Sequence, residues 1–110
     1  MVESSACIYV LRIYWTVAEH FSGFDWDVAN VTHILRHKVT PLEVEETVAL
    51  PHVTIPGRTV SGEPRWQMFG KTAAGRHLTI VFTVRGKLFR TVTAYPMNGT
   101  ERKRYGPQIP

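Results

Sequence analysis

Two runs of β-branched and aromatic residues, separated by a short turn, dominate the hydrophobic pattern of the chain. They span residues 77–84 and 87–95, with Arg85-Gly86 between them. Val, Ile, Thr and Phe side chains suit a pleated sheet, and glycine tolerates the positive φ of a tight turn. A two-residue loop at 85–86 would pair Phe82 with Phe89. Because neither face of this hairpin is fully polar, we expect it to be central in its sheet.

A first helix is predicted after a pair of aspartates. Asp25 or Asp27 can accept hydrogen bonds from the free N–H groups at a helix N-terminus, and both carboxylates suit the positive end of its dipole. Apolar residues at helical spacing then predict a buried stripe made of Val28, Val31 and Leu35. The polar residues from Asn30 to His37 would lie on a more exposed face, and the helix would end near 38–39.

A second helix is predicted over residues 40–49. Thr40 is a good N-cap, Pro41 fits the first helical position because its missing N–H is not needed there, and Glu43 completes a capping box. Pro51 follows shortly after the predicted end. The signals at both ends therefore agree on one short helix.

The remaining segments complete a sheet and add a C-terminal helix. A short strand is expected over 52–55, and an alternating strand over 65–70 leads into the hairpin. Asn98 or Thr100 can cap a short basic helix that ends at Tyr105. The predicted fold is therefore α+β, with two N-terminal helices packed on a four-stranded antiparallel sheet and a short C-terminal helix.

The first part of the chain does not share this pattern. Residues 8–17 are almost continuously apolar, but they are too few to span a bilayer, which takes roughly 20 residues. No basic region precedes them and no small-residue cleavage site follows, so a signal peptide is not expected. Helix and strand remain equally open here. We expect residues 1–23 to form an N-terminal extension and residues 24–110 to form the domain.

Charge is distributed unevenly along the chain. Residues 1–50 hold seven acids and three bases, a net charge of −4, whereas residues 51–110 hold two acids and ten bases, a net charge of +8. A basic sheet half favours a polyanion such as RNA, or an acidic protein, as partner. The single cysteine, Cys7, excludes an intramolecular disulfide framework and a multi-cysteine metal site, which favours the cytoplasm.

Several short motifs, in order, resemble those of BrnT-type toxins. The matching stretches are Phe24-Asp25-Trp26-Asp27, Leu35-Arg36-His37-Lys38-Val39-Thr40, Gly62-Glu63-Pro64-Arg65, Phe69-Gly70-Lys71, Arg90 to Ala94, and Glu101-Arg102-Lys103-Arg104-Tyr105. Together they cover about residues 24–105. The resemblance implies a RelE-like fold and a small cytoplasmic ribonuclease of a type II toxin–antitoxin module, neutralised by a cognate antitoxin that also binds DNA.

The resemblance also implies which positions matter. It marks Arg65, in the Gly-Glu-x-Arg motif, as functionally important. It expects an arginine at the end of the last strand, where this chain has Tyr95, and a glycine where this chain has Lys38. The resemblance implies that the arginine of the last strand is functionally important, so Tyr95 would have to take its place or the activity would be altered or lost.

Three residues are therefore candidates for catalysis. Arg65 is suited to bidentate phosphate binding, because its guanidinium stays protonated. Tyr95 can stack on a base or donate a proton, and His37 can act as acid or base near neutral pH. Strand alternation places Arg90 on the opposite face from Tyr95 and Phe82 on the same face as Tyr95, unless a bulge intervenes.

Further basic residues are candidates for RNA binding. They are Lys38, Lys71, Lys87, Arg90, Arg102 and Lys103. Each has an alternative role in solubility or in antitoxin contact. His33 and His37 are spaced as a helical metal pair, but no third ligand follows at a suitable spacing, so neither a metal nor another cofactor is expected.

Three functions remain open on these grounds. The leading hypothesis is a metal-independent endoribonuclease that is inhibited by a cognate antitoxin. Its substrate would be RNA, and no membrane is expected as a partner. The second is a catalytically inactive RelE-like module whose basic face binds an acidic protein or RNA. The third is a structural protein that oligomerises through its N-terminal apolar segment. A homodimer or a toxin–antitoxin heterotetramer is the expected assembly.

Overall fold

A five-stranded sheet, in the order β1-β5-β4-β3-β2, forms the middle of the protein. This computed structural model describes residues 21–110, so Cys7 and the apolar run 8–17 lie outside the described residues. The elements are β1 Gly23–Phe24, α2 Val28–Arg36, α3 Pro41–Ala49, β2 His52–Pro56, β3 Trp66–Lys71, β4 His77–Arg85, β5 Leu88–Pro96, α4 Gly99–Tyr105 and the 3₁₀ turn Gly106–Gln108.

The sheet has one more strand than the sequence predicted. β1 lies parallel to β5, with Gly23 beside Leu88 and Phe24 beside Phe89. The Asp25 N–H donates to the Phe89 carbonyl at 2.9 Å, which closes this short pairing. A two-residue strand has too little sequence pattern to be predicted. Because β1 is parallel to β5, the sheet of this α+β fold is mixed and not purely antiparallel.

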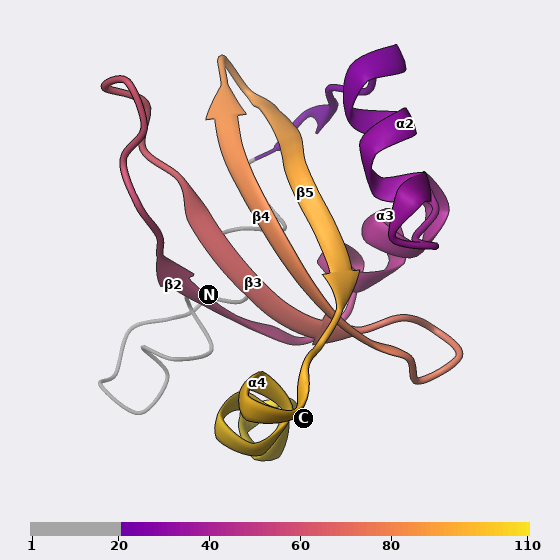
Figure 1. Ribbon diagram of the computed structural model, residues 1–110. Helices are drawn as coiled ribbons and strands as arrows, with labels where there is room; N and C mark the ends of the chain where they lie inside the picture. Colours follow the sequence, from indigo (N-terminus) through magenta and orange to yellow (C-terminus); the bar gives the residue numbers. More distant parts are fainter. Residues whose placement is uncertain (1–20) are drawn as a thin grey trace.

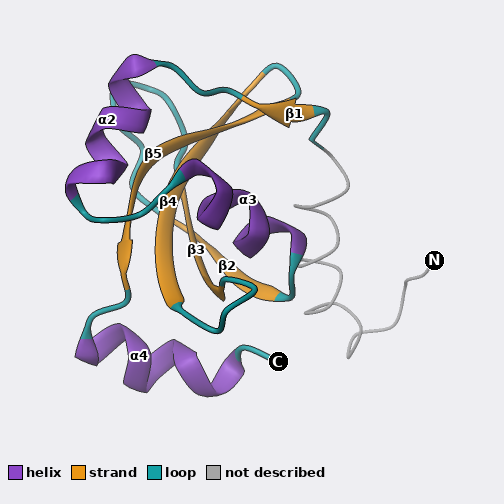
Figure 2. Ribbon diagram, turned by 90° about the vertical axis from the view of Figure 1, so that its right-hand side faces the viewer, coloured by secondary structure: helices purple, strands orange, loops and turns teal. Residues whose placement is uncertain are grey.

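The two faces of the sheet pack against different helices (Figures 1 and 2). On one face, α2 and α3 cover the main core, which includes Ile34, Val44, Met68, Ile80, Phe82 and Phe89. On the other face, α4 lies across the end of the sheet opposite β1, as Figure 2 shows. There Phe69 stacks on Tyr105 with ring centroids 4.0 Å apart. We call this second side the α4 face.

Helix caps were predicted well. Asp27, Thr40 and Asn98 are the N-caps of α2, α3 and α4, and each forms a reciprocal capping box with the residue three positions later. α2 ends at Arg36, slightly earlier than expected, because Lys38 adopts a left-handed backbone with φ of 61°. This is the conformation that glycine favours, and it agrees with the glycine that the resemblance expects at this position.

The buried stripe of α2 was predicted wrongly. Val28 is 83% exposed and Leu35 is 49% exposed, whereas Asn30 and Ile34 are buried. The Asn30 amide donates to the carbonyls of Asp25 and Thr91, at 2.9 and 3.1 Å. Because these bonds satisfy the polar group, it can face the sheet without a desolvation penalty, and the apolar pattern of the helix alone misplaces its inner side.

The central hairpin is confirmed, with a shifted turn. Its two-residue loop is Gly86-Lys87, one position later than predicted, and Gly86 has a φ of 63°. Glycine at the first loop position is typical of a tight hairpin turn that matches the twist of the strands. Phe82 consequently pairs with Thr91, while Phe89 pairs with Val84.

Candidate active site

A β-bulge in β5 decides which side of the sheet carries Tyr95. The pairing of β4 with β5 shifts at Val92, which is an extra residue in the ladder. Beyond it Ala94, and not Tyr95, joins the core under α2 and α3. Tyr95 therefore lies on the α4 face together with Arg90, and the placement of Tyr95 beside Phe82 was wrong.

Tyr95 and Glu101 form the centre of a polar cluster on the α4 face. The Tyr95 hydroxyl donates to Oε2 of Glu101 at 2.9 Å, and the Thr79 hydroxyl donates to Oε1 at 2.9 Å. Glu101 is held by its capping box, in which its N–H donates to Oδ1 of Asn98 at 2.8 Å. The residue that caps α4 therefore also fixes the phenol.

This environment changes the proton affinity of Tyr95. Burial, followed by the hydrogen bond and the negative charge of Glu101, raises the pKa of Tyr95 from 10 to about 12. The phenol is consequently protonated throughout the physiological range. It can donate a hydrogen bond or stack on a base, but it cannot accept a proton as a general base.

Replacing Glu101 with glutamine is expected to lower the pKa of Tyr95 below about 12 while leaving it above 10. The neighbouring negative charge, which disfavours the phenolate, is lost, whereas burial remains. The ¹³Cζ resonance of labelled tyrosine, followed between pH 8 and pH 12, measures this change. Glu46→Gln is the control, because the Glu46 carboxylate bonds the Ala73 N–H on the loop beside α3. An unchanged titration in Glu101→Gln would contradict the assigned cause.

Two histidines from the end of α2 lie beside Tyr95. The ring centroid of His37 is 6.3 Å from that of Tyr95 and 5.3 Å from that of His33. A ring nitrogen of His33 lies 3.0 Å from the Thr93 hydroxyl. His37 is the C-cap of α2 and is exposed, whereas His33 is partly covered. Two of the three catalytic candidates, His37 and Tyr95, therefore come together at one accessible place.

Arg65 does not join this cluster. Arg65 directly precedes β3 and is four residues from Phe69. Phe69 pairs with Thr79 of β4, and Thr79 pairs with Tyr95 of β5. Strand geometry then puts the Cα atoms of Arg65 and Tyr95 roughly 16 Å apart, from about 13 Å along β3 and about 10 Å across two strands. Arg65 instead lies 3.8 Å from a carboxylate oxygen of Glu63.

The six RNA-binding candidates occupy different parts of the surface. The Arg90 side chain is 15% exposed and forms ion pairs with Asp27 at 2.9 Å and Asp25 at 3.5 Å. The bond to Asp27 and the two negative charges raise the pKa of Arg90, and its charge is paired at the start of α2. The other five are partly or fully exposed: Lys38 follows α2, Lys71 ends β3, Lys87 lies in the hairpin turn, and Arg102 and Lys103 lie on α4. Figure 1 shows the hairpin turn at the opposite end of the sheet from α4.

Sequence reasoning missed the contact between Glu101 and Tyr95. The capping pattern of Asn98 and Glu101 was present in the sequence, but a capping box predicts only bonds to the backbone of its own helix. That the same carboxylate also accepts a bond from β5 depends on the bulge at Val92, for which the sequence carries no turn residue. The contact of His33 with Thr93 depends on the same bulge.

Metal-binding groups and membrane-spanning helices were also considered for the described residues. Within residues 21–110, no group of three His, Cys, Asp or Glu side chains is placed to hold a metal ion. In the same part of the chain, no helix has the length and apolar character needed to cross a membrane.

Comparison with known proteins gives one family. The family described as "Ribonuclease toxin, BrnT, of type II toxin-antitoxin system" matches residues 26–101, which is well over half of the chain. None of the curated proteins matches the chain. The matched range includes Arg65, Tyr95, His33 and His37, and it ends at Glu101.

Proposed function

The chain belongs to the BrnT family of ribonuclease toxins of type II toxin–antitoxin systems, and from this premise we propose that it is an endoribonuclease that cleaves RNA at its α4 face without a metal ion. The family match over residues 26–101 carries this proposal. The joining of His37, Tyr95 and Glu101 at one surface supports the location.

Metal-free cleavage of RNA requires a base for the 2′-hydroxyl, a proton for the leaving oxygen and a positive environment for the phosphorane. We assign His37 as the base that accepts the proton of the 2′-hydroxyl, and the leaving 5′-oxygen takes its proton from water. Histidine titrates near neutral pH, and the ring of His37 is exposed next to Tyr95. Arg65 is too far from this position for the scissile phosphate, so we assign it to a flanking phosphate.

Tyr95 acts through its ring in this proposal. Its hydroxyl donates a hydrogen bond to Glu101, and its pKa of about 12 makes the phenol a weak acid at neutral pH. Proton donation to a leaving group would break this bond and leave a phenolate beside the negative charge of Glu101. Stacking on an unpaired base needs neither, and aromatic stacking is a common way to hold single-stranded RNA.

The test is cleavage of RNA by the purified chain in the presence of EDTA. Activation of the 2′-hydroxyl predicts fragments that carry a 2′,3′-cyclic phosphate and a 5′-hydroxyl. Induction of the gene alone is expected to arrest growth and to degrade cellular RNA. Intact RNA in both experiments would overturn the ribonuclease proposal. Intact RNA combined with tight RNA binding would favour the catalytically inactive module.

We further propose that a cognate antitoxin inhibits this activity and that both proteins act in the cytoplasm, where the RNA is. Co-expression with the product of an adjacent small gene is expected to restore growth. Light scattering of the purified pair would distinguish a heterotetramer from a heterodimer, and light scattering of the toxin alone would detect a homodimer. A pair that forms no complex would contradict this partner.

A further inference from the structure

Three basic residues lie at the end of the sheet that α4 covers. Lys71, the last residue of β3, pairs with His77, the first residue of β4. Cross-strand partners project on the same side, and the pairing of Phe69 with Thr79 shows that this side is the α4 face. Arg102 of α4 follows Glu101, whose carboxylate accepts a hydrogen bond from the hydroxyl of Thr79, two residues from His77, and the charge of Arg102 helps to lower the pKa of His77.

The loop between Lys71 and His77 is closed by its own hydrogen bonds. The Thr72 N–H donates to the Arg76 carbonyl at 2.9 Å, and the Arg76 N–H donates to the Thr72 hydroxyl at 3.1 Å. The Gly75 N–H donates back to the Thr72 carbonyl at 2.9 Å. The two residues that flank this loop are therefore held in one register.

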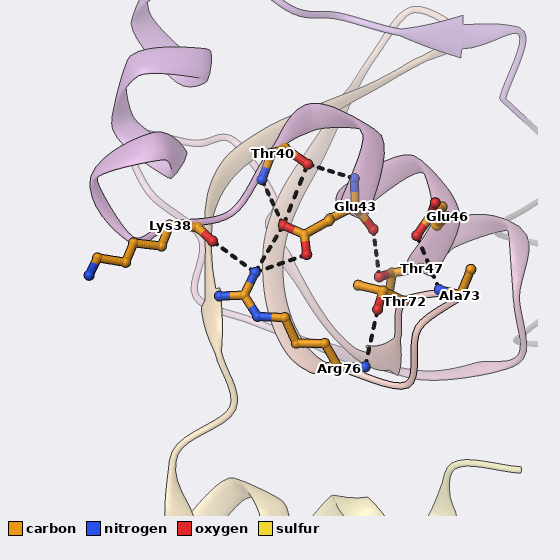
Figure 3. Close-up of polar contacts among 8 residues, drawn as sticks. All are labelled: Lys38, Thr40, Glu43, Glu46, Thr47, Thr72, Ala73 and Arg76. Carbon is orange, nitrogen blue, oxygen red and sulfur yellow. Dashed lines mark hydrogen bonds and ion pairs between the residues drawn. The ribbon is translucent and has the colours of Figure 1, made fainter.

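The same loop is anchored to the helices on the other side of the sheet (Figure 3). The Arg76 guanidinium donates to both carboxylate oxygens of Glu43 at 2.9 Å and to the Lys38 carbonyl at 2.8 Å. The Ala73 N–H donates to the Glu46 carboxylate at 3.1 Å. Because this anchoring restricts the loop before any ligand arrives, binding beside it would cost less conformational entropy.

α4 is also fixed beside the paired residues Lys71 and His77. The Met97 N–H, just before the helix, donates to the His77 carbonyl at 3.1 Å. Glu101 holds Thr79 and Tyr95, and Tyr105 stacks on Phe69. Arg102 therefore projects from a helix whose two ends are both attached to the sheet.

The charges that act on His77 are positive. Burial, then the charges of Arg102 and Lys71, lower the pKa of His77, and among the described residues both charged groups that shift it are basic. Glu101, next to Arg102, adds one negative charge, and the hydroxyls of Thr79 and Tyr95 hold its carboxylate against β4 and β5. Two cations and one carboxylate leave a net positive charge, which attracts an anion.

We propose that Lys71, His77 and Arg102 form a binding site for one phosphate of an RNA strand, next to the base held at Tyr95. This proposal rests on the proposed ribonuclease function. Tyr95 pairs with Thr79, two residues from His77, so strand geometry separates the two Cα atoms by only about 8 Å. The site supplies the positive environment near His37 that Arg65 is too distant to supply.

The experiment measures binding of a 2′-O-methyl RNA oligonucleotide, which cannot be cleaved, to the full chain at several salt concentrations. Lys71→Gln and Arg102→Gln are each expected to weaken binding roughly tenfold. The double variant should reduce the slope of log affinity against log salt by about 0.7, the value for one phosphate of a single strand. Because both cations contact the same phosphate, each single variant should reduce the slope by less.

Arg58→Gln is the matched control, because Arg58 is an exposed base in the loop between β2 and β3, away from this site. It should keep the affinity and the slope of the parent chain, and melting curves establish that all variants are folded. Unchanged binding in Lys71→Gln and Arg102→Gln, or an equal loss in Arg58→Gln, would overturn the proposal.

A second arm separates this proposal from the ribonuclease function. Inorganic phosphate is titrated while the imidazole resonances of His77 are followed by NMR. Phosphate is expected to shift them in the parent chain and to leave them unmoved in the double variant. If RNA is neither bound nor cleaved but phosphate shifts His77, the ribonuclease function fails and the anion site stands. If RNA is cleaved but phosphate leaves His77 unmoved, the site fails and the function stands.

Discussion

Replacing His37 with alanine is expected to reduce the rate of RNA cleavage by about 10²- to 10⁴-fold, the usual contribution of a general acid or base. His37 is the exposed imidazole of the cluster, and its ring lies against Tyr95. Within residues 21–110, its side chain forms no hydrogen bond that would be lost in the variant, and its role as C-cap of α2 uses only its backbone N–H. The fold should therefore be unaffected.

The measurement is single-turnover cleavage of an RNA oligonucleotide by both proteins across pH 5 to 9. His33→Ala is the control, because His33 contacts Thr93 and can only orient its neighbour. It should lose less activity than His37→Ala and keep the pH dependence of the parent chain. Full activity of His37→Ala, or the same pH profile in all three proteins, would remove His37 from the mechanism.

Local signals predicted the parts of the fold in which one residue decides one bond. Thr40, Pro41 and Glu43 define the start of α3 through contacts within a single turn, and the structure has each of them in the expected place. Gly86 marks the hairpin for a similar reason, since its φ of 63° is a property of one residue. Capping and turn chemistry are short-range, so they can be predicted from the sequence.

Errors arose where a distant contact outweighed the local pattern. Asn30 lies in the core because the Thr91 carbonyl, 61 positions away, accepts its hydrogen bond. The valine and leucine of α2 that helical periodicity had placed inside are exposed as a result. Likewise, the bulge at Val92 moves Tyr95 to the other side of the sheet, and no residue type marks a bulge of this kind.

The candidate site was predicted in its residues more than in its arrangement. His37 and Tyr95 were both chosen for their chemistry, and the structure brings them together through the end of α2 and the bulge in β5. Arg65 was chosen by resemblance, and the register of the sheet separates it from them. Chemical suitability is a property of one side chain, whereas proximity depends on the register of three strands.

Gly70 sits where β3 is covered most tightly, and this predicts the largest effect on stability. It pairs with His52 of β2 and Leu78 of β4. A Cβ atom at this position would lie 2.7 Å from Cγ2 of Thr47 and 3.0 Å from Cβ of His52. Both neighbours are fully buried, so neither can move aside easily. The absence of a side chain at Gly70 leaves room for Thr47 of α3 and for His52 of the neighbouring strand β2.

Gly70→Val is therefore expected to lower the free energy of unfolding by about 3 kcal/mol, the upper part of the range for overpacked cores. For a domain of this size that loss corresponds to a fall in Tm of roughly 15 °C. Gly70→Ala should be less damaging, because it adds only the Cβ atom. Thermal melting followed by circular dichroism measures both changes.

Gly99→Ala is the matched control, because a Cβ atom there meets no neighbour within 4 Å and Gly99 opens α4. It should keep or slightly raise the Tm, since alanine favours helix more than glycine does.

Equal melting temperatures for Gly70→Val and the parent chain would mean that α3 can move away from β3. The loop anchored by Glu43 and Glu46 would then be looser than its contacts indicate, and Lys71 and His77 would no longer be held in place for a phosphate. A large loss at Gly70 alone would instead tie the order of this end of the sheet to the packing of α3.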